Sequence, residues 1–223
     1  MRSDSEPPGQ KDSFIRETRR KQILQGAIET LAAVGYANAS LARIAADLGI
    51  SKGVISYHFR NKETLMTSVV EHAYQDIFET IVPNILAAES VIEAIRTHIR
   101  EVARYALEHR STMVALSEVI GNLRRPDGRL HYGAESNEVL YPGLEEMYRS
   151  GRAAGELREF DDRVMAITQQ AAVDAMFAYW QTHPEHDLIR HAEELGDLIV
   201  RAVAATPTEP PSPPRGSRKK RTR

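Results

Sequence analysis

The side chains that could do chemistry gather in one short stretch, and they are suited to donating hydrogen bonds. Between Ser51 and Phe59 the chain carries a set of such donors on a short helical segment: Lys52, Ser56, Tyr57 and His58. Ammonium, hydroxyl and imidazole groups suit phosphate oxygens and the edges of bases. Gly53 stands in the same segment, although glycine costs roughly 1 kcal/mol relative to alanine inside a helix. We therefore expect a close approach to the backbone at Gly53, such as that of a base edge in a major groove.

Two short helices joined by a tight turn are expected to position these donors. Ser40 can cap the first helix, whose apolar residues recur at the spacing of one buried face: Leu41, Ile44, Ala45 and Leu48. Gly49 stands where a helix ends in a left-handed residue, and Ser51 can cap the second helix. Asn61 can cap a third, with Glu63 in its first turn, where the helix dipole favours an acid. This order is typical of a DNA-reading helix-turn-helix.

The stretch from Gly35 to Leu65 resembles the N-terminal domain of the TetR family of bacterial transcriptional regulators. The matching pattern is G-Y-x-x-x-S-L-x-x-I-A-x-x-L-G-I-S-K-G-x-I-S-Y-H-F-x-N-K-E-x-L, with Ala39 where the family often has Thr or Ser. The resemblance implies that five residues contact DNA phosphates: Ser40, Ser51, Tyr57, His58 and Lys62. It implies that three face base edges: Lys52, Gly53 and Ser56. The alternatives are packing against neighbouring helices for Tyr57 and His58, and a solvated side chain for Lys52.

Helical periodicity continues through the rest of the chain, which is predicted to be all-α with about nine helices. The expected helices span 14–34, 61–81, 90–109, 111–123, 134–152, 161–182 and 187–205, in addition to the two short ones. Pro83 is expected to end the second of these, and Pro142 to interrupt the fifth. Arg16, Arg19, Arg20 and Lys21 cluster in the first, where they could brace phosphates or simply be solvated.

The chain divides by composition into four parts. We expect a disordered arm over residues 1–13, a helix-turn-helix domain over 14–62, an effector-binding and dimerisation domain over 63–206 and a disordered basic tail over 207–223. Residues 1–65 carry ten Lys and Arg against seven Asp and Glu, whereas residues 66–206 carry 13 against 23. A basic end on an acidic body suits a protein that touches nucleic acid with one part only.

The resemblance also implies a ligand cavity between the helices of the second domain. The candidate lining residues are Phe78, Ile81, Met113, Leu116, Ile120, Leu140, Tyr141, Met147, Gln170, Asp174, Phe177 and Trp180. Ordinary core packing is the alternative for each. Gln170 and Asp174 are the sharper candidates, because buried polar groups need partners and a ligand could be one.

Several classes of protein do not fit the sequence. The absence of cysteine excludes disulfides, thiolate metal sites and cysteine nucleophiles. No apolar run is long enough to span a membrane, the N-terminus does not resemble a secretory signal, and no catalytic or nucleotide-binding motif is present. The one cluster with metal-like donors, around His183, His186 and His191, is more simply a solvated loop. We therefore expect a cytoplasmic protein that is not an enzyme and needs no cofactor or metal.

The expected function is that of a ligand-responsive DNA-binding transcriptional regulator. The resemblance to the TetR family implies a repressor, because most members of that family are repressors. A homodimer would bind a palindromic operator, and a small-molecule effector would release it. The alternative is a DNA-binding architectural or partner-recruiting protein without an effector. An open cavity with convergent polar groups would favour the first, and a solid core the second.

Overall fold

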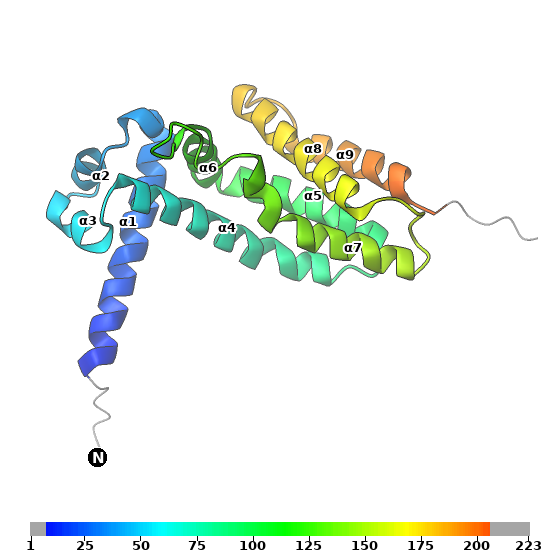
Figure 1. Ribbon diagram of the computed structural model, residues 1–223, viewed down its shortest axis with the longest axis horizontal. Helices are drawn as coiled ribbons and strands as arrows, with labels where there is room; N and C mark the ends of the chain where they lie inside the picture. Colours follow the sequence, from blue (N-terminus) through cyan, green and yellow to red (C-terminus); the bar gives the residue numbers. More distant parts are fainter. Residues whose placement is uncertain (1–7, 206–223) are drawn as a thin grey trace, which may run out of the picture.

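The computed structural model describes residues 8–205, and the regular elements assigned in that range are all helices. Figure 1 shows an N-terminal head joined by one long helix to a bundle. The head consists of α1 (Pro8–Asn38), α2 (Leu41–Asp47) and α3 (Lys52–His58), and α4 (Lys62–Leu86) leaves it. The bundle adds α5 (Val91–Glu108), α6 (Arg110–Asn122), the 3₁₀ helix η1 (Ala134–Val139), α7 (Tyr141–Ala153), α8 (Asp162–Thr182) and α9 (Leu188–Val203). The all-α prediction is confirmed.

Side-chain caps fix the short helices of the head where the sequence predicts them. Ser40 Oγ accepts a hydrogen bond from the Arg43 N–H at 3.1 Å. Ser51 Oγ accepts one from the Val54 N–H at 3.4 Å. Gly49 has φ 65°, the left-handed conformation that glycine adopts without a Cβ penalty. The turn between α2 and α3 is therefore set by local sequence.

The long helices depart from the expected bounds at three prolines. α1 begins at Pro8 rather than at residue 14, so part of the expected arm is helical, while residues 1–7 and 207–223 lie outside the described residues. α4 continues through Pro83 to Leu86. Only one turn follows Pro83, and the Ala87 N–H still donates to its carbonyl at 3.1 Å. The expected helix over 134–152 is two elements, with Pro142 in the first turn of α7, where a missing N–H needs no partner.

A single apolar core runs from the head into the bundle along α4. Ile23, Ala27 and Ile28 of α1 and Ile44 of α2 are buried in the same core as Leu65 at the start of α4. Further along, Ile77 and Ile81 of α4 are buried in the same core as Ile95 and Ile99 of α5. Because α4 belongs to both parts, a tilt at one end moves side chains at the other. None of the helices within residues 8–205 has the length and apolar character that crossing a membrane requires.

Close packing at Gly151 gives a prediction about stability. A Cβ at this position would lie 2.6 Å from Leu157 Cδ1 and 2.8 Å from Val91 Cγ1. Overpacking a core typically costs about 1–3 kcal/mol, so Gly151→Val should lower the free energy of unfolding by that amount in urea titrations. Gly143→Val on the same helix is the control, since a Cβ there meets no atom within 4 Å. Equal stability of the two variants would contradict the packing described.

Candidate nucleic-acid interface and ligand cavity

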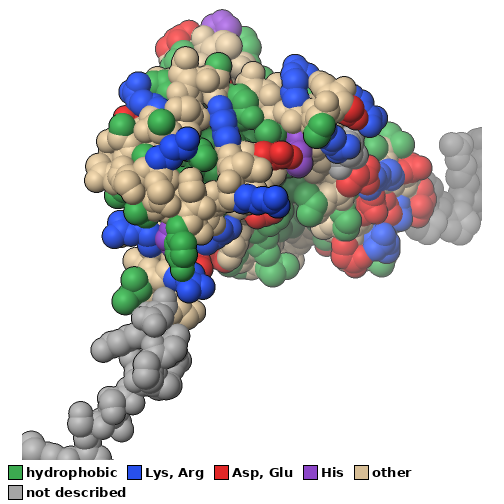
Figure 2. All heavy atoms as spheres, turned by 60° about the vertical axis from the view of Figure 1, so that its left-hand side comes forward, with side chains coloured by type: hydrophobic (Ala, Val, Ile, Leu, Met, Phe, Trp, Pro, Cys, Tyr) green, Lys and Arg blue, Asp and Glu red, His purple; other side chains and the backbone are tan. Residues whose placement is uncertain are grey.

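The outer face of α3 presents most of the predicted donors to solvent. Ile55 and Phe59 are fully buried and anchor the helix. Ser51, Lys52, Gly53 and Ser56 are exposed, as is Ser40 at the start of α2. The Tyr57 side chain is 70% exposed, so this ring does not pack into the head. Figure 2 shows Lys and Arg side chains distributed over this end of the molecule.

His58 and Lys62 are less free than the other predicted contacts. His58 is half-buried with its ring edge on Tyr57, and burial together with Arg16, Arg20 and Arg19 lowers its pKa. Lys62 Nζ donates a hydrogen bond to the Tyr36 carbonyl at 2.6 Å and lies 4.1 Å from the centre of the Tyr36 ring. Burial lowers the pKa of Lys62 as well. In this structure Lys62 braces the turn before α2.

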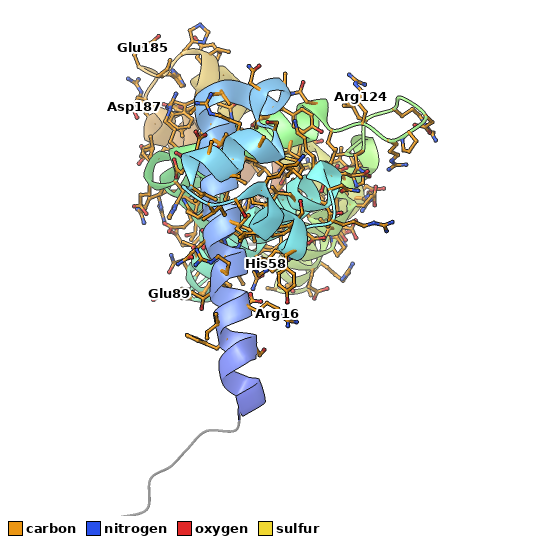
Figure 3. The ribbon with its side chains drawn as sticks, turned by 90° about the vertical axis from the view of Figure 1, so that its left-hand side faces the viewer. Arg16, His58, Glu89, Arg124, Glu185 and Asp187 are labelled. Atoms are coloured by element: carbon orange, nitrogen blue, oxygen red, sulfur yellow. The ribbon has the colours of Figure 1, made fainter. Side chains whose placement is uncertain are left out.

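Arginines of α1 extend the donor surface beyond α3. The Arg16 guanidinium lies 5.9 Å from the centre of the Tyr57 ring, and Figure 3 shows Arg16 and His58 on the same side of the head. Arg20 lies 4.5 Å from the Phe59 ring centre and donates to Ser68 Oγ at 2.9 Å. Arg16 therefore joins the candidate interface, while Arg20 is partly occupied in holding α1 on α4. The sequence signal for both is their spacing on one face of the helix.

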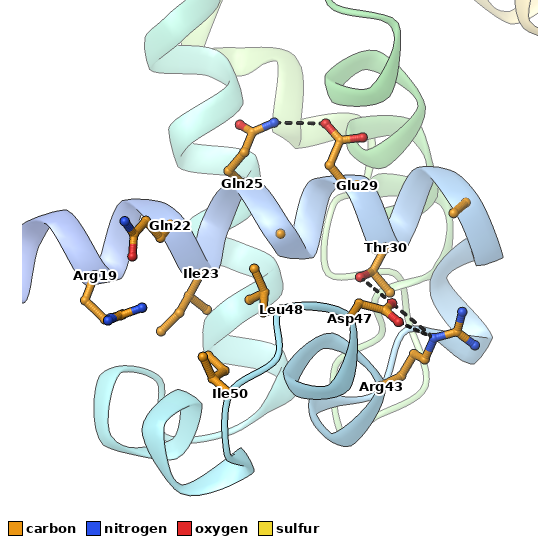
Figure 4. Close-up of a pocket in the computed structure, with 12 residues that line it drawn as sticks. Arg19, Gln22, Ile23, Gln25, Glu29, Thr30, Arg43, Asp47, Leu48 and Ile50 are labelled. Carbon is orange, nitrogen blue, oxygen red and sulfur yellow. Dashed lines mark hydrogen bonds and ion pairs between the residues drawn. The ribbon is translucent and has the colours of Figure 1, made fainter.

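A hollow of about 700 Å³ lies on the head between α1 and α2 (Figure 4). On its wall, Asp47 accepts from the Thr30 hydroxyl at 3.0 Å and pairs with Arg43 at 2.9 Å. A Cβ on Gly26 would come within 2.4 Å of the Leu48 side chain. These contacts hold α2 rigidly on α1 and so fix the orientation of α3.

The backbone of Tyr36 is hydrogen-bonded to both α4 and α6. Its N–H donates to Glu118 Oε2 of α6 at 2.7 Å, and its carbonyl accepts from Lys62 of α4. Gly35, with φ 74°, makes the turn, and a Cβ there would lie 3.3 Å from the Glu118 carboxylate. A relative movement of α4 and α6 therefore acts directly on the residues that lead into α2.

A cavity of about 530 Å³ opens between α4, α5 and α7. This volume is within the range of about 300–1,000 Å³ that is typical of small-molecule sites. Five of the twelve candidate residues line it: Phe78, Ile81, Leu140, Met147 and Gln170. Sequence reasoning missed the polar groups around them, of which the principal ones are Glu89, Ser90, His98 and Glu156. Ser90 carries a sequence signal, because it is the N-cap of α5.

The other seven candidates do not line this cavity. Met113, Leu116, Phe177 and Trp180 are buried in the main core, with Ile120 packed against it. Tyr141 packs with Leu144 and Ala166 in a smaller cluster. Asp174 is exposed and accepts hydrogen bonds from Gln170 at 2.8 Å and from Asn137 at 3.0 Å. The polar pair singled out in the sequence thus finds its partners within the protein.

A short polar chain links the cavity to the interior of the bundle. The Tyr148 hydroxyl donates to Gln169 Oε1, and Gln169 Nε2 is 2.9 Å from His98 Nδ1. Burial lowers the pKa of His98 to about 4. His98 is therefore a neutral ring at pH 7, and the Gln169 amide favours the tautomer that carries its proton on Nε2.

The lowered pKa of His98 predicts a loss of stability in mild acid. The unfolded chain has a His pKa of about 6.5, so it takes up the proton before the folded protein does as the pH falls. The contribution of neutral His98 to the free energy of unfolding is therefore complete above pH 6.5 and decreases toward pH 4. The shift corresponds to roughly 3 kcal/mol. Urea unfolding between pH 7.5 and 4.5 should show a shallower pH dependence in His98→Gln, which cannot charge. An equal dependence in both proteins would contradict the assignment.

Known proteins resemble this chain in the sequence of the head and in the fold of most of the chain. Residues 23–69 match the family model described as bacterial regulatory proteins, tetR family. The chain is 37% identical over 88 residues to the HTH-type transcriptional regulator BetI 1 of Chromohalobacter salexigens. That match covers 40% of this chain and 42% of the relative, so less than half of the curated protein is spanned.

Solved structures extend the likeness to most of the chain. The transcriptional regulator FadR from Bacillus subtilis, solved in complex with stearoyl-CoA, has a TM-score of 0.70 at 23% identity, covering 81% of this chain and 97% of that one. The fatty acid degradation regulator FadR from Bacillus halodurans has a TM-score of 0.68 at 21% identity, with the same coverage. These neighbours share the fold. The head therefore resembles the bacterial regulatory proteins of the tetR family, and the chain as a whole shares the fold of these solved structures.

Proposed function

We propose that the protein is a dimeric DNA-binding transcriptional regulator, acting as a repressor that a small-molecule effector releases from its operator. The observation that carries the proposal is the exposed donor face of α3 on a head that shares α4 with a cavity-bearing bundle. A solid bundle would favour an architectural protein that senses no ligand. The cavity, with polar groups among its apolar walls, favours a sensor. Such a regulator works in the cytoplasm, where its DNA lies.

The proposed contacts follow from exposure on the head. Lys52, Gly53 and Ser56 face base edges in the major groove, and the residues around them contact phosphates: Ser40, Ser51, Tyr57, His58 and Arg16. Lys62 acts chiefly by holding the turn at Tyr36. Residues 14–62 form the reading domain in this proposal, and residues 63–206 the sensing and dimerisation domain.

An exposed apolar face on α8 supports a dimer. Val164, Ile167 and Tyr179 are 57%, 44% and 48% exposed. They follow helical spacing with three exposed small residues: Ala171, Ala175 and Ala178. Leu198 of α9 is a further exposed apolar residue, at 60%. Small residues let two helices approach closely, so α8 and α9 of two protomers would form a four-helix interface. Two heads would then enter successive major grooves about one helical turn apart.

The effector would act through α4. Phe78, Ile81 and Val82 line the cavity, and the same helix begins beside the reading head. A ligand that binds one tilt of α4 more tightly shifts the population toward that tilt. The changed spacing of the two heads then no longer fits the operator. That the neighbouring FadR fold was solved with stearoyl-CoA supports a small-molecule site in this architecture.

Operator binding tests the proposal. The full-length protein is titrated with duplex DNA from the promoter next to its own gene, and with a shuffled duplex of equal length, at several salt concentrations. We expect tighter binding to the promoter and a steep loss of affinity with salt, because phosphate contacts release counterions. Arg16→Ala should reduce the slope of log affinity against log salt by about one, the value for one phosphate contact made by a charged side chain. Equal, salt-insensitive binding to both duplexes would refute the proposal.

A further inference from the structure

The charged side chains that line the cavity between α4, α5 and α7 are all acidic. Three carboxylates line it, those of Glu89, Glu146 and Glu156, and neither Lys nor Arg is among its lining residues. Its one imidazole, His98, is uncharged at neutral pH because burial lowers its pKa to about 4. Its walls are otherwise mainly apolar. The cavity therefore combines an apolar body with negative charge and offers no permanent cation.

The three carboxylates differ in how far the protein already uses them. Glu146 pairs with Arg149 on the same helix. Glu156 Oε2 accepts the Val91 N–H at 2.9 Å and the Ile92 N–H at 3.4 Å, and so caps α5. Glu89 makes no hydrogen bond or ion pair with any residue between 8 and 205 for which contacts are described, and it is exposed. The carboxylate left for a ligand is that of Glu89.

Charge therefore decides which class of molecule the cavity accepts. A carboxylate or phosphate brought into it would lose hydration and meet only like charge, with no compensating cation. A positively charged group at Glu89 gains attraction there, while an attached apolar chain is buried against walls such as Ile81 and Leu144. We propose that the effector is an amphiphilic cation, an apolar molecule ending in an ammonium or amidinium group that pairs with Glu89. That the bound cation acts as an effector rests on the proposed function.

Probes with one alkyl chain and three head groups test the charge preference. Binding of decyltrimethylammonium, decanol and decanoate to the full-length protein is measured by isothermal titration calorimetry, below the concentrations at which the probes form micelles. We expect decyltrimethylammonium to bind at least about tenfold more tightly than decanoate, with decanol between them and competing with the cation for the site. Tenfold corresponds to about 1.4 kcal/mol, within reach of one change from attraction to repulsion.

Variants of Glu89 assign the preference to this residue. Glu89→Gln should weaken decyltrimethylammonium about fivefold and leave decanol unchanged, because the upper value for an exposed ion pair is about 1 kcal/mol. Glu89→Lys should remove or reverse the preference over decanoate. Glu185→Gln is the matched control, an exposed acid in the α8–α9 loop that does not line the cavity (Figure 3). It should bind all three probes as the wild type does.

The outcomes separate this inference from the proposed function. No binding of the cation, decanoate binding as tightly as the cation, or equal effects of Glu89→Gln and Glu185→Gln would overturn the inference. Operator affinity is measured separately with and without decyltrimethylammonium. A protein that binds the cation through Glu89 but has no preference for its promoter keeps the binding site and refutes the regulator. A protein that binds its promoter but prefers decanoate keeps the regulator and refutes the ligand class.

Discussion

A well-folded monomer with little affinity for its operator is the expected result of Ile167→Asp. Ile167 lies on the exposed apolar face of α8 and is 44% exposed. In a monomer the new carboxylate stays in water, so the fold is retained. In the proposed four-helix interface it would be buried beside apolar and small residues without a cationic partner, which costs several kcal/mol per subunit.

The effect on DNA binding should be larger than the effect on stability. One head makes only half of the contacts, and losing the link between two heads typically costs 10²–10⁴-fold in affinity. We expect at least about a 100-fold loss. Sedimentation equilibrium gives the oligomeric state, and titration of the promoter duplex gives the affinity.

An exposed leucine on another helix provides the control for this substitution. Leu107 of α5 is 46% exposed, but it is not on α8 or α9. Leu107→Asp makes the same change in charge and should leave both the dimer and the operator affinity intact. If Ile167→Asp remained dimeric with full affinity, the interface would lie elsewhere and the proposed spacing of the heads would be wrong.

The sequence predicted best what local rules determine. The caps at Ser40 and Ser51 and the left-handed Gly49 depend on neighbours within three residues, and all three are found. Periodicity also predicted a helix over residues 161–182, where α8 is found. It did not reveal that an apolar face of α8 is exposed, because periodicity shows that a face is apolar without showing what covers it.

The cavity was predicted less well for a related reason. Helical spacing marks inner faces, but a gap arises only where two inner faces fail to meet. Phe78 and Met147 border such a gap, whereas Met113 and Trp180 are packed in core. Contacts between distant residues were also invisible to spacing. The Tyr36 N–H and Glu118 are 82 positions apart, and this bond is one of the contacts that join the head to α6.

Gly53→Leu should make the protein more stable and abolish operator binding. A Cβ at Gly53 meets only Ser51 Oγ, at 3.6 Å, so the folded protein has room for a side chain there. Glycine in a helix costs up to about 1 kcal/mol relative to leucine, and the free energy of unfolding should rise by up to that amount. On DNA the same side chain would occupy the space where α3 meets the base edges. We expect at least about a 100-fold loss of operator affinity, or nearly 3 kcal/mol, in promoter titrations paired with urea unfolding.

The matched control is a helical glycine remote from α3. Gly121 of α6 also has no atom within 4 Å of its Cβ position, and it is exposed. Gly121→Leu should raise stability or leave it unchanged while retaining wild-type operator affinity. If only the Gly53 substitution raised stability and weakened operator binding, this glycine would be required by DNA and not by the fold, because no contact within the described protein requires it. If Gly53→Leu bound the promoter as tightly as the wild type, α3 would not be the helix that lies in the groove.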